Sequence, residues 1–472
     1  MSSAEVIVVG AGTAGLAAAS ELATRGARVV LVEKSERIGG TLHVSAGQMS
    51  GAGTRLQKAR GIHDTPDLHF ADAMRISKGT ADPALVRRAV DLAPDTIDWL
   101  MDEGFDLDPV CPAILHYHEA YRLARTYWGR EGGRSILAVL ERVFGRAREI
   151  GRIDLRFGAR LVGLEGTPGS AVTGIRIAAA DGRETSIAAD AVILASGGYG
   201  ADRGRFARWT GGRPMFSACM PTSTGDGIAI AETFGARVDG GDLFLPTFGG
   251  VESEPGGGRV IWDELPQLTP QSRPPWEIYV DTAGRRFVAE DHPSVDARET
   301  ALLEKPDLTF WIVYDSKIAR TAPPLLPGWP ERRLDAAFAG HSAFVRADTL
   351  GDLAARTGLP AAALAESVAA YNAALVRGSP DPLGRTHRPA PIVEPPFLAV
   401  KSHGIVLKTP AGIRIDDQLR VLGADAPIEG LYAIGEAIGG SRLSGKSFVG
   451  GMSVTPALSF GRWIARRLAS GG

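Results

Sequence analysis

A chain of 472 residues exceeds the size of one typical hydrophobic core, so at least two domains are predicted. Its 52 basic and 54 acidic residues give a net charge of −2 without a run of Lys or Arg, which argues against a nucleic-acid-binding protein. Cys111 and Cys219 lack metal-site spacing, and no apolar run reaches membrane-spanning length, so we expect a cytoplasmic protein without membrane insertion.

The stretch from Val6 to Glu33, VIVVGAGTAGLAAASELATRGARVVLVE, predicts a strand, a tight glycine turn, a helix and a second strand. Gly10 permits the turn, Gly12 lets a pyrophosphate approach the backbone, and Gly15 lets the helix pack closely on the strand. The helix N-terminus offers free N–H groups to phosphates, and Glu33 can accept hydrogen bonds from ribose hydroxyls. This pattern predicts a dinucleotide site.

A second glycine-rich loop, KSERIGGTLHVSAGQ, follows from Lys34 to Gln48. Its small residues suit a backbone that wraps closely around a bound ligand. Thr41 and Ser45 can supply hydroxyl groups to a flavin ring or to its ribitol chain.

Residues 66–104 are predicted as helices at 66–74, 83–90 and 93–102, because apolar residues recur three and four positions apart. The next segment, 115–129, gathers histidines, tyrosines, a glutamate and a tryptophan. His116, Tyr117 and Tyr121 are candidates for a catalytic acid, a base or the wall of a substrate pocket. A packed loop or an interface is the alternative.

Further glycine elements follow along the chain. A β-rich segment at 153–187 precedes a strand that ends on Ser196, Gly197 and Gly198, and a loop containing Asp226 precedes a helix. After about residue 235 the composition shifts toward proline, aromatic residues and glycine turns, with a predicted hairpin at 276–291 and helices at 350–375. We therefore expect an inserted domain at 236–385.

The C-terminal part returns to the character of the first domain. Residues 430–440, GLYAIGEAIGG, predict a strand that leads to Gly435 and Glu436, and this glutamate can accept from ribitol hydroxyls. Residues 449–461 open the last helix, whose N-terminus can stabilise negative charge on a reduced flavin.

Four motifs in this order, GAGTAG with Glu33, ILASGG, TGDG and GLYAIGE, resemble the fumarate reductase and succinate dehydrogenase flavoprotein superfamily, which also holds 3-ketosteroid Δ1-dehydrogenases. The resemblance implies an α/β fold with a Rossmann-like FAD-binding domain formed by residues 1–235 and 386–472. An α+β cap, or substrate, domain at 236–385 would be inserted between them. The active site would lie at the domain boundary, over the flavin ring.

The resemblance also implies how FAD is held. Succinate dehydrogenase flavoproteins attach the flavin through a histidine near His43, but His43 is one position away from theirs, so noncovalent FAD is expected. The candidate cofactor-binding residues are Gly10, Gly12, Ala14, Gly15, Glu33, Lys34, Gly40, Thr41, Ser45, Gly47, Gln48, Ser196, Gly197, Gly198, Asp226, Gly435, Glu436, Ser453 and Val454.

The substrate-binding positions depart from the fumarate reductase pattern. This chain has Leu245, Lys408 and Phe448 where those enzymes hold two substrate carboxylates with two histidines and an arginine. Burying carboxylates without cationic partners costs several kcal/mol. Fumarate is therefore not the expected substrate.

The segment from Gly445 to Gly461 instead resembles a ketosteroid dehydrogenase pattern in which a tyrosine and a glycine N–H polarise a ketone oxygen. Phe448 replaces that tyrosine, whereas the N–H near Gly451 can remain. Lys446 or Tyr117 would have to substitute for the missing hydroxyl.

Arg298 follows a segment similar to the G-x-R-F…S-R-D stretch of the superfamily, whose arginine moves a proton opposite the flavin. The resemblance implies that role, or the binding of a substrate carboxylate. A surface salt bridge with Glu290 or Glu299 is the alternative.

The sequence thus favours an FAD-dependent dehydrogenase that introduces a C=C bond α,β to the carbonyl of a cyclic ketone, either a ketosteroid or an oxocyclohexanecarboxylate. A base (Tyr117, Tyr121 or His116) removes the α-proton, and N–H groups near Gly451 stabilise the enolate. An external electron acceptor or donor is required. The alternatives are the reverse reduction of an enone or enoate, and an electron-transfer flavoprotein subunit.

Overall fold

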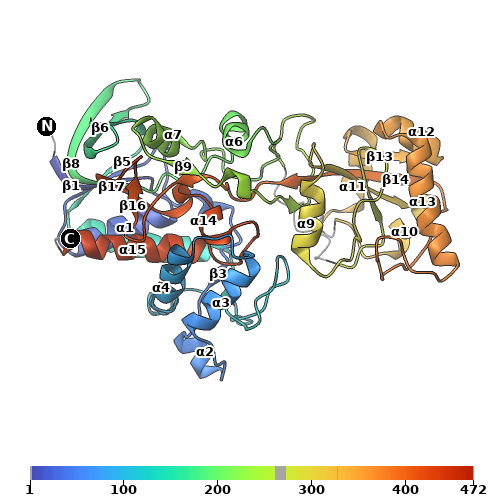
Figure 1. The fold of residues 1–472 in the computed structure, drawn as a ribbon, viewed down its shortest axis with the longest axis horizontal. Helices are drawn as coiled ribbons and strands as arrows, with labels where there is room; N and C mark the ends of the chain where they lie inside the picture. Colours follow the sequence, from blue (N-terminus) through green and yellow to red (C-terminus); the bar gives the residue numbers. More distant parts are fainter. Residues whose placement is uncertain (1–2, 261–272, 327, 471–472) are drawn as a thin grey trace. The chain divides into compact units, whose positions relative to one another are not determined.

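The computed structural model describes residues 3–260, 273–326 and 328–470. The chain forms two compact units, and each is described by itself (Figure 1). The first unit contains the residues before Arg213, the segment Cys219–Phe244 and the residues from Lys408 on; the second contains Arg213–Ala218 and Leu245–Leu407.

The first unit is built on an eight-stranded sheet in the order β16-β17-β7-β8-β1-β2-β5, with β6 paired to β7. Strands β1, β2, β5, β8 and β17 pair in parallel, while β6, β7 and β8 form an antiparallel meander. The strands are β1 (Ser3–Val9), β2 (Val29–Val32), β5 (Ile153–Arg156), β6 (Arg160–Thr167), β7 (Ala171–Ala178), β8 (Glu184–Leu194), β16 (Arg420–Leu422) and β17 (Pro427–Ala433).

The central strands are continuous apolar runs because both faces of this part of the sheet are covered. Helix α1 (Thr13–Thr24) packs on β1 and β2, and α15 (Val454–Ala469) packs on α1. Small residues permit this contact: a Cβ on Gly461 of α15 would lie 2.6 Å from the carbonyl oxygen of Ala14. The two chain ends, blue and red in Figure 1, thereby build one unit.

Of the other helices of this unit, α5 packs on α1, α4 packs on α15, and α7 packs on β6. They are η1 (Gly40–His43), α2 (Arg55–Ala59), α3 (Pro66–Ile76), α4 (Pro83–Asp102), α5 (Gly133–Glu149), α6 (Arg203–Thr210), α7 (Asp226–Thr233), η2 (Gly241–Leu243), η5 (Gly435–Ile438) and α14 (Ser441–Ser444). Two small antiparallel pairs, β3 (Met49–Ser50) with β4 (Thr126–Tyr127) and β9 (Val238–Asp239) with β15 (Gly412–Ile413), complete it.

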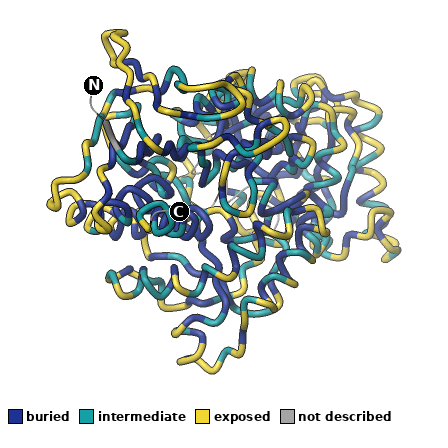
Figure 2. The backbone as a smooth tube through the Cα atoms, turned by 60° about the vertical axis from the view of Figure 1, so that its left-hand side comes forward, coloured by how far each residue is buried: buried dark blue, intermediate teal, exposed yellow. Residues whose placement is uncertain are grey.

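The second unit is an antiparallel sheet in the order β10-β14-β12-β11, with β13 also paired to β14. Its strands are β10 (Thr247–Phe248), β11 (Ile278–Asp281), β12 (Thr309–Asp315), β13 (Phe344–Ala347) and β14 (Phe397–Ile405). Its helices are α9 (Val295–Leu303), α10 (Ser316–Thr321), α11 (Glu331–Gly340), α12 (Leu350–Thr357) and α13 (Ala361–Val376). Strands and helices of both units contribute to the buried core, whose residues are dark blue in Figure 2.

The predicted fold class is confirmed: a mixed α/β unit with parallel strands from both chain ends and an inserted unit. The inserted unit, however, extends to Leu407 rather than to residue 385. The reason is β14, which lies between β10 and β12 and also pairs with β13. A strand in this position belongs to the sheet that it holds together.

Two local predictions differ from the structure. The helices expected at 83–90 and 93–102 are one helix, α4, which continues through Pro94 because a row of residues, including Leu85, Ala89, Ala93 and Ile97, is buried along one face. The hairpin expected at 276–291 is reduced to β11 and a single bridge between Val280 and Arg286. The helices expected at 350–375 are confirmed as α12 and α13. Among the described residues, no helix combines the length and apolar character needed to cross a membrane.

Candidate functional site

The turn between β1 and α1 leaves open space at one glycine and none at two others. A Cβ on Gly10 would lie 2.5 Å from the carbonyl oxygen of Ala195, and one on Gly15 would lie 1.8 Å from that of Gly10. A Cβ on Gly12 would meet no atom within 4 Å, and Gly12 caps α1 without a side-chain hydrogen bond. The turn therefore combines free volume with an uncapped helix N-terminus, as a pyrophosphate requires.

Glu33 closes this turn from the end of β2. Its Oε2 accepts a hydrogen bond of 2.8 Å from the Ala11 N–H, and its Oε1 accepts from the N–H and hydroxyl of Ser35. The carboxylate is thereby fixed beside the glycine turn, with lone pairs remaining for a ribose.

The loop after Glu33 turns through η1 and is held by local bonds. Thr41 is exposed there, and the Ser45 hydroxyl accepts from the Gly47 N–H at 2.9 Å. His43 forms a 2.8 Å hydrogen bond with the Ile38 carbonyl. This is the ordinary backbone contact expected of a loop histidine.

Other predicted cofactor residues gather at Gly198. A Cβ there would lie 2.2 Å from Thr409 Oγ1 and 2.4 Å from Glu436 Oε1, so only glycine fits. Glu436 Oε1 accepts from the Thr409 N–H and hydroxyl at 2.7 and 2.8 Å, and burial raises the pKa of Glu436. The buried hydroxyl oxygen of Ser196 has no hydrogen-bond partner among the described residues.

Asp226 is the first residue of α7, and its carboxylate forms ion pairs with two basic side chains. Lys34 Nζ and Arg205 Nη1 lie 3.0 and 2.9 Å from its carboxylate oxygens. Although burial opposes ionisation, these bonds lower the pKa of Asp226 to about 2. The carboxylate therefore ties the loop after β2 to α6 and α7. At the far end of the chain, Ser453 caps α15 without a side-chain hydrogen bond.

These features fit a flavin dinucleotide. Open space at Gly12, two uncapped helix N-termini and a buried hydroxyl at Ser196 are unused by the protein itself. Each is of a kind that phosphate, ribitol or flavin oxygen atoms would satisfy.

The polar-aromatic segment separates into exposed and buried members. His116 and Tyr117 are exposed, whereas the ring of His118 stacks on Phe448, with centroids 3.6 Å apart. Lys408 Nζ lies 4.1 Å from the centroid of Phe448 and donates to Ser444 at 2.6 Å. Burial, and next the charge of Lys408, lower the pKa of His118 to about 3. The structure thus groups His118 with Lys408 and Phe448, although the sequence pattern did not mark His118 as a site residue.

Tyr121 is buried, and burial raises its pKa, so the phenol keeps its proton at neutral pH. Its hydroxyl donates to the carbonyl of Gly450 at 2.6 Å and lies 3.3 Å from Nε2 of His69. These contacts disfavour its expected role as a base. His69 was not foreseen, because it reads as an ordinary residue of α3.

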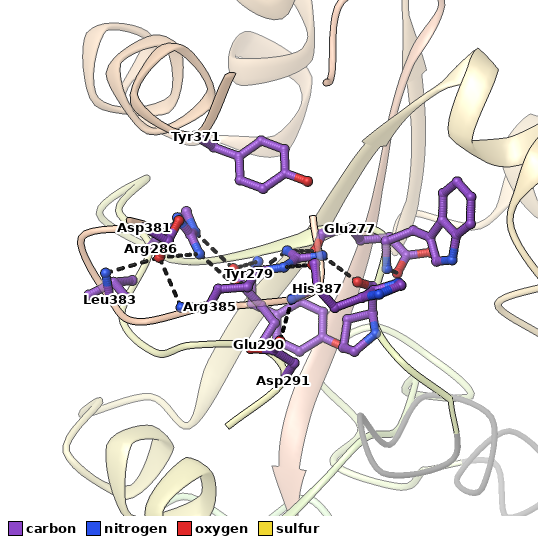
Figure 3. A network of polar contacts seen from close by, with 12 residues as sticks. Glu277, Tyr279, Arg286, Glu290, Asp291, Tyr371, Asp381, Leu383, Arg385 and His387 are labelled. Atoms are coloured by element: carbon purple, nitrogen blue, oxygen red, sulfur yellow. Dashed lines mark hydrogen bonds and ion pairs between the residues drawn. The ribbon is translucent and has the colours of Figure 1, made fainter. Parts of the chain in front are cut away.

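In the second unit, Arg298 lies on α9 and is only 5% exposed, so it does not lie at the protein surface. Glu290, one of the two partners considered for it, is occupied by other arginines (Figure 3). Arg286 donates to it twice, at 2.9 and 2.7 Å, and Arg385 lies 3.3 Å away. Asp381 accepts from Arg286 at 2.7 Å, which joins the segment before α9 to residues 381–387.

A buried histidine, His403, lies on β14 of this unit. His403 bonds to Thr309 Oγ1 at 2.9 Å and stacks on Phe216, while Glu252 lies 3.6 Å from its Nε2. That separation is too long for a strong hydrogen bond, and burial lowers the pKa of His403 to about 3.

Three histidines whose pKa burial strongly lowers should make the protein sensitive to mild acid. For His69, His118 and His403 the folded-state pKa lies below the unfolded value of 6.5. The unfolded chain therefore binds these protons first, and stability that is complete above pH 6.5 is lost as the pH falls. We expect the free energy of unfolding to decrease by about 1.4 kcal/mol per pH unit for each histidine between roughly pH 6 and 5.

Urea unfolding followed by circular dichroism across this pH range measures that slope. His403→Gln should remove about a third of it, whereas the matched change His63→Gln, at an exposed position, should leave it intact. A slope equal in all three proteins would contradict the prediction.

The geometry agrees with what comparison with known proteins finds. The model of the family described as "FAD binding domain" matches residues 5–452. A probable fumarate reductase, Ifc3, of Shewanella frigidimarina is 30% identical over 466 residues, which cover 97% of this chain and 73% of the relative.

Solved structures give the same result. The open conformation of a flavocytochrome c3 fumarate reductase aligns with a TM-score of 0.75 and 28% identity, over 99% of this chain and 78% of the other. A 3-ketosteroid Δ1-dehydrogenase from Sterolibacterium denitrificans aligns over 100% of both chains with a TM-score of 0.80, but at 23% identity this likeness concerns the fold alone.

Proposed function

Because this chain belongs to the FAD-binding flavoproteins of the fumarate reductase and succinate dehydrogenase superfamily, we propose that it reduces a C=C bond conjugated to one acyl group. FAD is its cofactor, and the reaction exchanges electrons between FAD and a small molecule. The substrate would carry one carboxylate or carbonyl oxygen and a flat apolar body, unlike the dicarboxylate fumarate.

The contact between Lys408 and Phe448 carries this proposal. The first unit has a lysine and a phenylalanine where the family resemblance puts a histidine and an arginine. One cation remains, held 4.1 Å above an aromatic face. A single ammonium can hold one anionic or carbonyl oxygen, and the ring offers apolar contact instead of a second charge.

The residues of this chain would then act as follows. Gly12 and the start of α1 would hold the pyrophosphate, Glu33 a ribose, and Ser196 and Glu436 the ribitol and flavin, while the bound FAD supplies the hydride. Lys408 would bind and polarise the acyl oxygen. Arg298, an arginine inside the second unit, would supply the proton to the substrate.

The direction of the reaction is argued from the relatives. The curated relative at 30% identity and the solved structure at 28% identity that are described above both carry the name of a fumarate reductase. Dehydrogenation of a cyclic ketone is the second candidate, favoured by the likeness of Gly445–Gly461 to the ketosteroid dehydrogenase pattern. The electron donor, noncovalent attachment of FAD and a cytoplasmic location stay predictions.

A substrate panel tests the proposal. The FAD-loaded protein is reduced anaerobically with dithionite and mixed with unsaturated monocarboxylic acids, enones or fumarate, while flavin absorbance is followed. We expect reoxidation by a monoacid or an enone and much slower reoxidation by fumarate. Fast turnover of fumarate alone would overturn the proposed substrate class, and bleaching of the oxidised protein by cyclic ketones would favour the second candidate.

Replacing Lys408 by methionine should weaken the binding of the acyl group. The lost charged hydrogen bond is worth about 1.5–3 kcal/mol, so KM should rise roughly 10- to 100-fold for carboxylate substrates. Steady-state kinetics measure this change, with Lys58→Met at an exposed position as the control. An unchanged KM in Lys408→Met would remove Lys408 from the substrate site.

A further inference from the structure

A chain of hydrogen bonds inside the first unit ends on the peptide group between Gly450 and Gly451. The Tyr121 hydroxyl donates to the Gly450 carbonyl at 2.6 Å, and Nε2 of His69 lies 3.3 Å from the same hydroxyl. The two rings meet edge to face, with centroids 5.3 Å apart. Arg125, whose guanidinium is held by Asp64, lies 5.1 Å from the centroid of the tyrosine ring. All these side chains are buried.

The protons of this chain have a consistent arrangement, in which the Ser50 hydroxyl, 3.5 Å from that of Tyr121, is a donor to it. A carbonyl oxygen can only accept, so the single proton of the Tyr121 hydroxyl points at Gly450. The hydroxyl oxygen then accepts from His69, whose Nε2 carries the proton of the neutral ring. Nδ1 of His69 has no hydrogen-bond partner among the described residues. The donors of Tyr121 and His69 therefore both face toward the peptide, and each bond polarises the next.

The opposite side of this peptide is free to act on a ligand. The bond is trans, so the N–H of Gly451 points away from the carbonyl that Tyr121 holds. That N–H donates to no acceptor within the described part of the chain. Gly451 has φ +75°, and a Cβ there would lie 2.3 Å from the Ser50 nitrogen, so the backbone is closely confined.

The carbonyl groups of the neighbouring peptides accept hydrogen bonds from backbone N–H groups. The Gly451 carbonyl accepts from Thr455 at 3.3 Å, in the first turn of α15, and the Val449 carbonyl accepts from Met452 at 3.3 Å. The Gly450–Gly451 peptide differs from these neighbours. Its oxygen accepts a hydrogen bond from a buried phenol, while its N–H donates to no acceptor in the described part of the chain.

We propose that Tyr121, supported by His69, is a positioning residue that orients and polarises this peptide so that the Gly451 N–H stabilises the developing oxyanion of the substrate. The inference rests on the proposed reaction, in which charge accumulates on an acyl oxygen. Because the Tyr121 hydroxyl donates its proton to the Gly450 carbonyl, we assign Tyr121 this positioning role and not the abstraction of a substrate proton. The N–H is the stronger donor because the carbonyl of the same peptide accepts a short hydrogen bond.

Tyr121→Phe removes only the hydroxyl and keeps the ring beside His69 and Arg125. We expect kcat to fall roughly tenfold, less than for loss of a direct oxyanion donor, with KM and FAD content little changed. Tyr127→Phe is the matched control, since Tyr127 is equally buried and its hydroxyl bonds instead to Thr54 at 2.7 Å. It should leave kcat unchanged.

A binding measurement separates polarisation from general disturbance. The oxidised FAD-loaded protein is titrated, through flavin absorbance at mildly alkaline pH, with para-nitrophenol, which is ionised, and with para-cresol, which is neutral and of similar size. Tyr121→Phe should weaken binding of the phenolate about tenfold and leave that of para-cresol within about twofold. Equal losses for both phenols would indicate a merely structural role and overturn the proposal.

The remaining outcomes are also decisive. A shifted flavin midpoint potential with unchanged phenolate affinity would assign the N–H to the cofactor and overturn the proposal. Selective loss of phenolate binding in a protein that turns over no unsaturated acid or enone would uphold the inference and reject the proposed function. Turnover by wild type, together with unchanged kcat and phenolate binding in Tyr121→Phe, would uphold the proposed function and reject the inference. If that variant does not fold, His69→Gln carries the same test, with a smaller selective loss expected.

Discussion

Arg298→Ala is expected to bind FAD normally and to turn over substrate about 10²- to 10⁴-fold more slowly than wild type, the range attributed to general acid catalysis. The expectation follows from the burial of this arginine on α9, where Asp296 and Glu299 are buried as well. Burying an arginine together with carboxylates carries a desolvation cost that ion pairing does not fully repay, which makes such a residue a candidate for a functional role. Proton delivery to the reduced substrate is the purpose that we assign to it.

Arg298→Lys distinguishes a proton donor from a structural cation. Lysine keeps the charge, but its ordinary pKa of about 10.4 lies below that of arginine. Partial activity should return, and the alkaline limb of the kcat profile should move to lower pH. A purely structural arginine would alter stability without moving that limb.

The control for both variants is Arg320→Ala, an exposed arginine of α10 in the same unit that pairs with Glu394. Single-turnover reoxidation of the reduced flavin, FAD content and thermal unfolding are measured on all three variants. A kcat for Arg298→Ala within about threefold of wild type, with full FAD content, would remove Arg298 from the reaction.

The parts of the fold that could be predicted are those whose cause is local. The glycine turn, α1 and Glu33 follow one another within a short stretch, and each residue acts on its neighbours. The boundary of the inserted unit could not be read in this way. β14 is as apolar as the strands of the first unit, and only its antiparallel partners β10, β12 and β13 assign it to the second.

Which of the candidate catalytic residues lies in a site could not be predicted from the sequence, for a similar reason. The polar-aromatic pattern marks His116, Tyr117 and Tyr121 together, but the fold exposes the first two and buries the third. Burial and a partner 329 positions away, Gly450, decide the protonation of Tyr121. His69 meets Tyr121 across 52 positions, and no local pattern marks such a contact.

Gly12→Ala and Gly15→Ala should both impair FAD binding, but for different physical reasons. At Gly15 the new methyl group would lie 1.8 Å from the Gly10 carbonyl oxygen, so the turn itself must move. We expect a loss of about 3 kcal/mol or more in the free energy of unfolding, together with loss of FAD. At Gly12 the methyl group would meet no protein atom within 4 Å, and φ is −83°, which alanine tolerates.

Gly12→Ala should therefore fold as stably as wild type while binding FAD roughly 10- to 100-fold more weakly, since overpacking against a pyrophosphate costs about 1–3 kcal/mol. Urea unfolding of the apoprotein and titration with FAD measure the two effects separately. Gly145→Ala is the control: Gly145 is exposed within α5 with no atom near its Cβ, so alanine there should stabilise the helix slightly and leave FAD affinity unchanged. Wild-type FAD affinity in Gly12→Ala would mean that the free volume at this turn is not where the pyrophosphate binds, because a methyl group placed on Gly12 must occupy the path by which a phosphate reaches the N-terminus of α1.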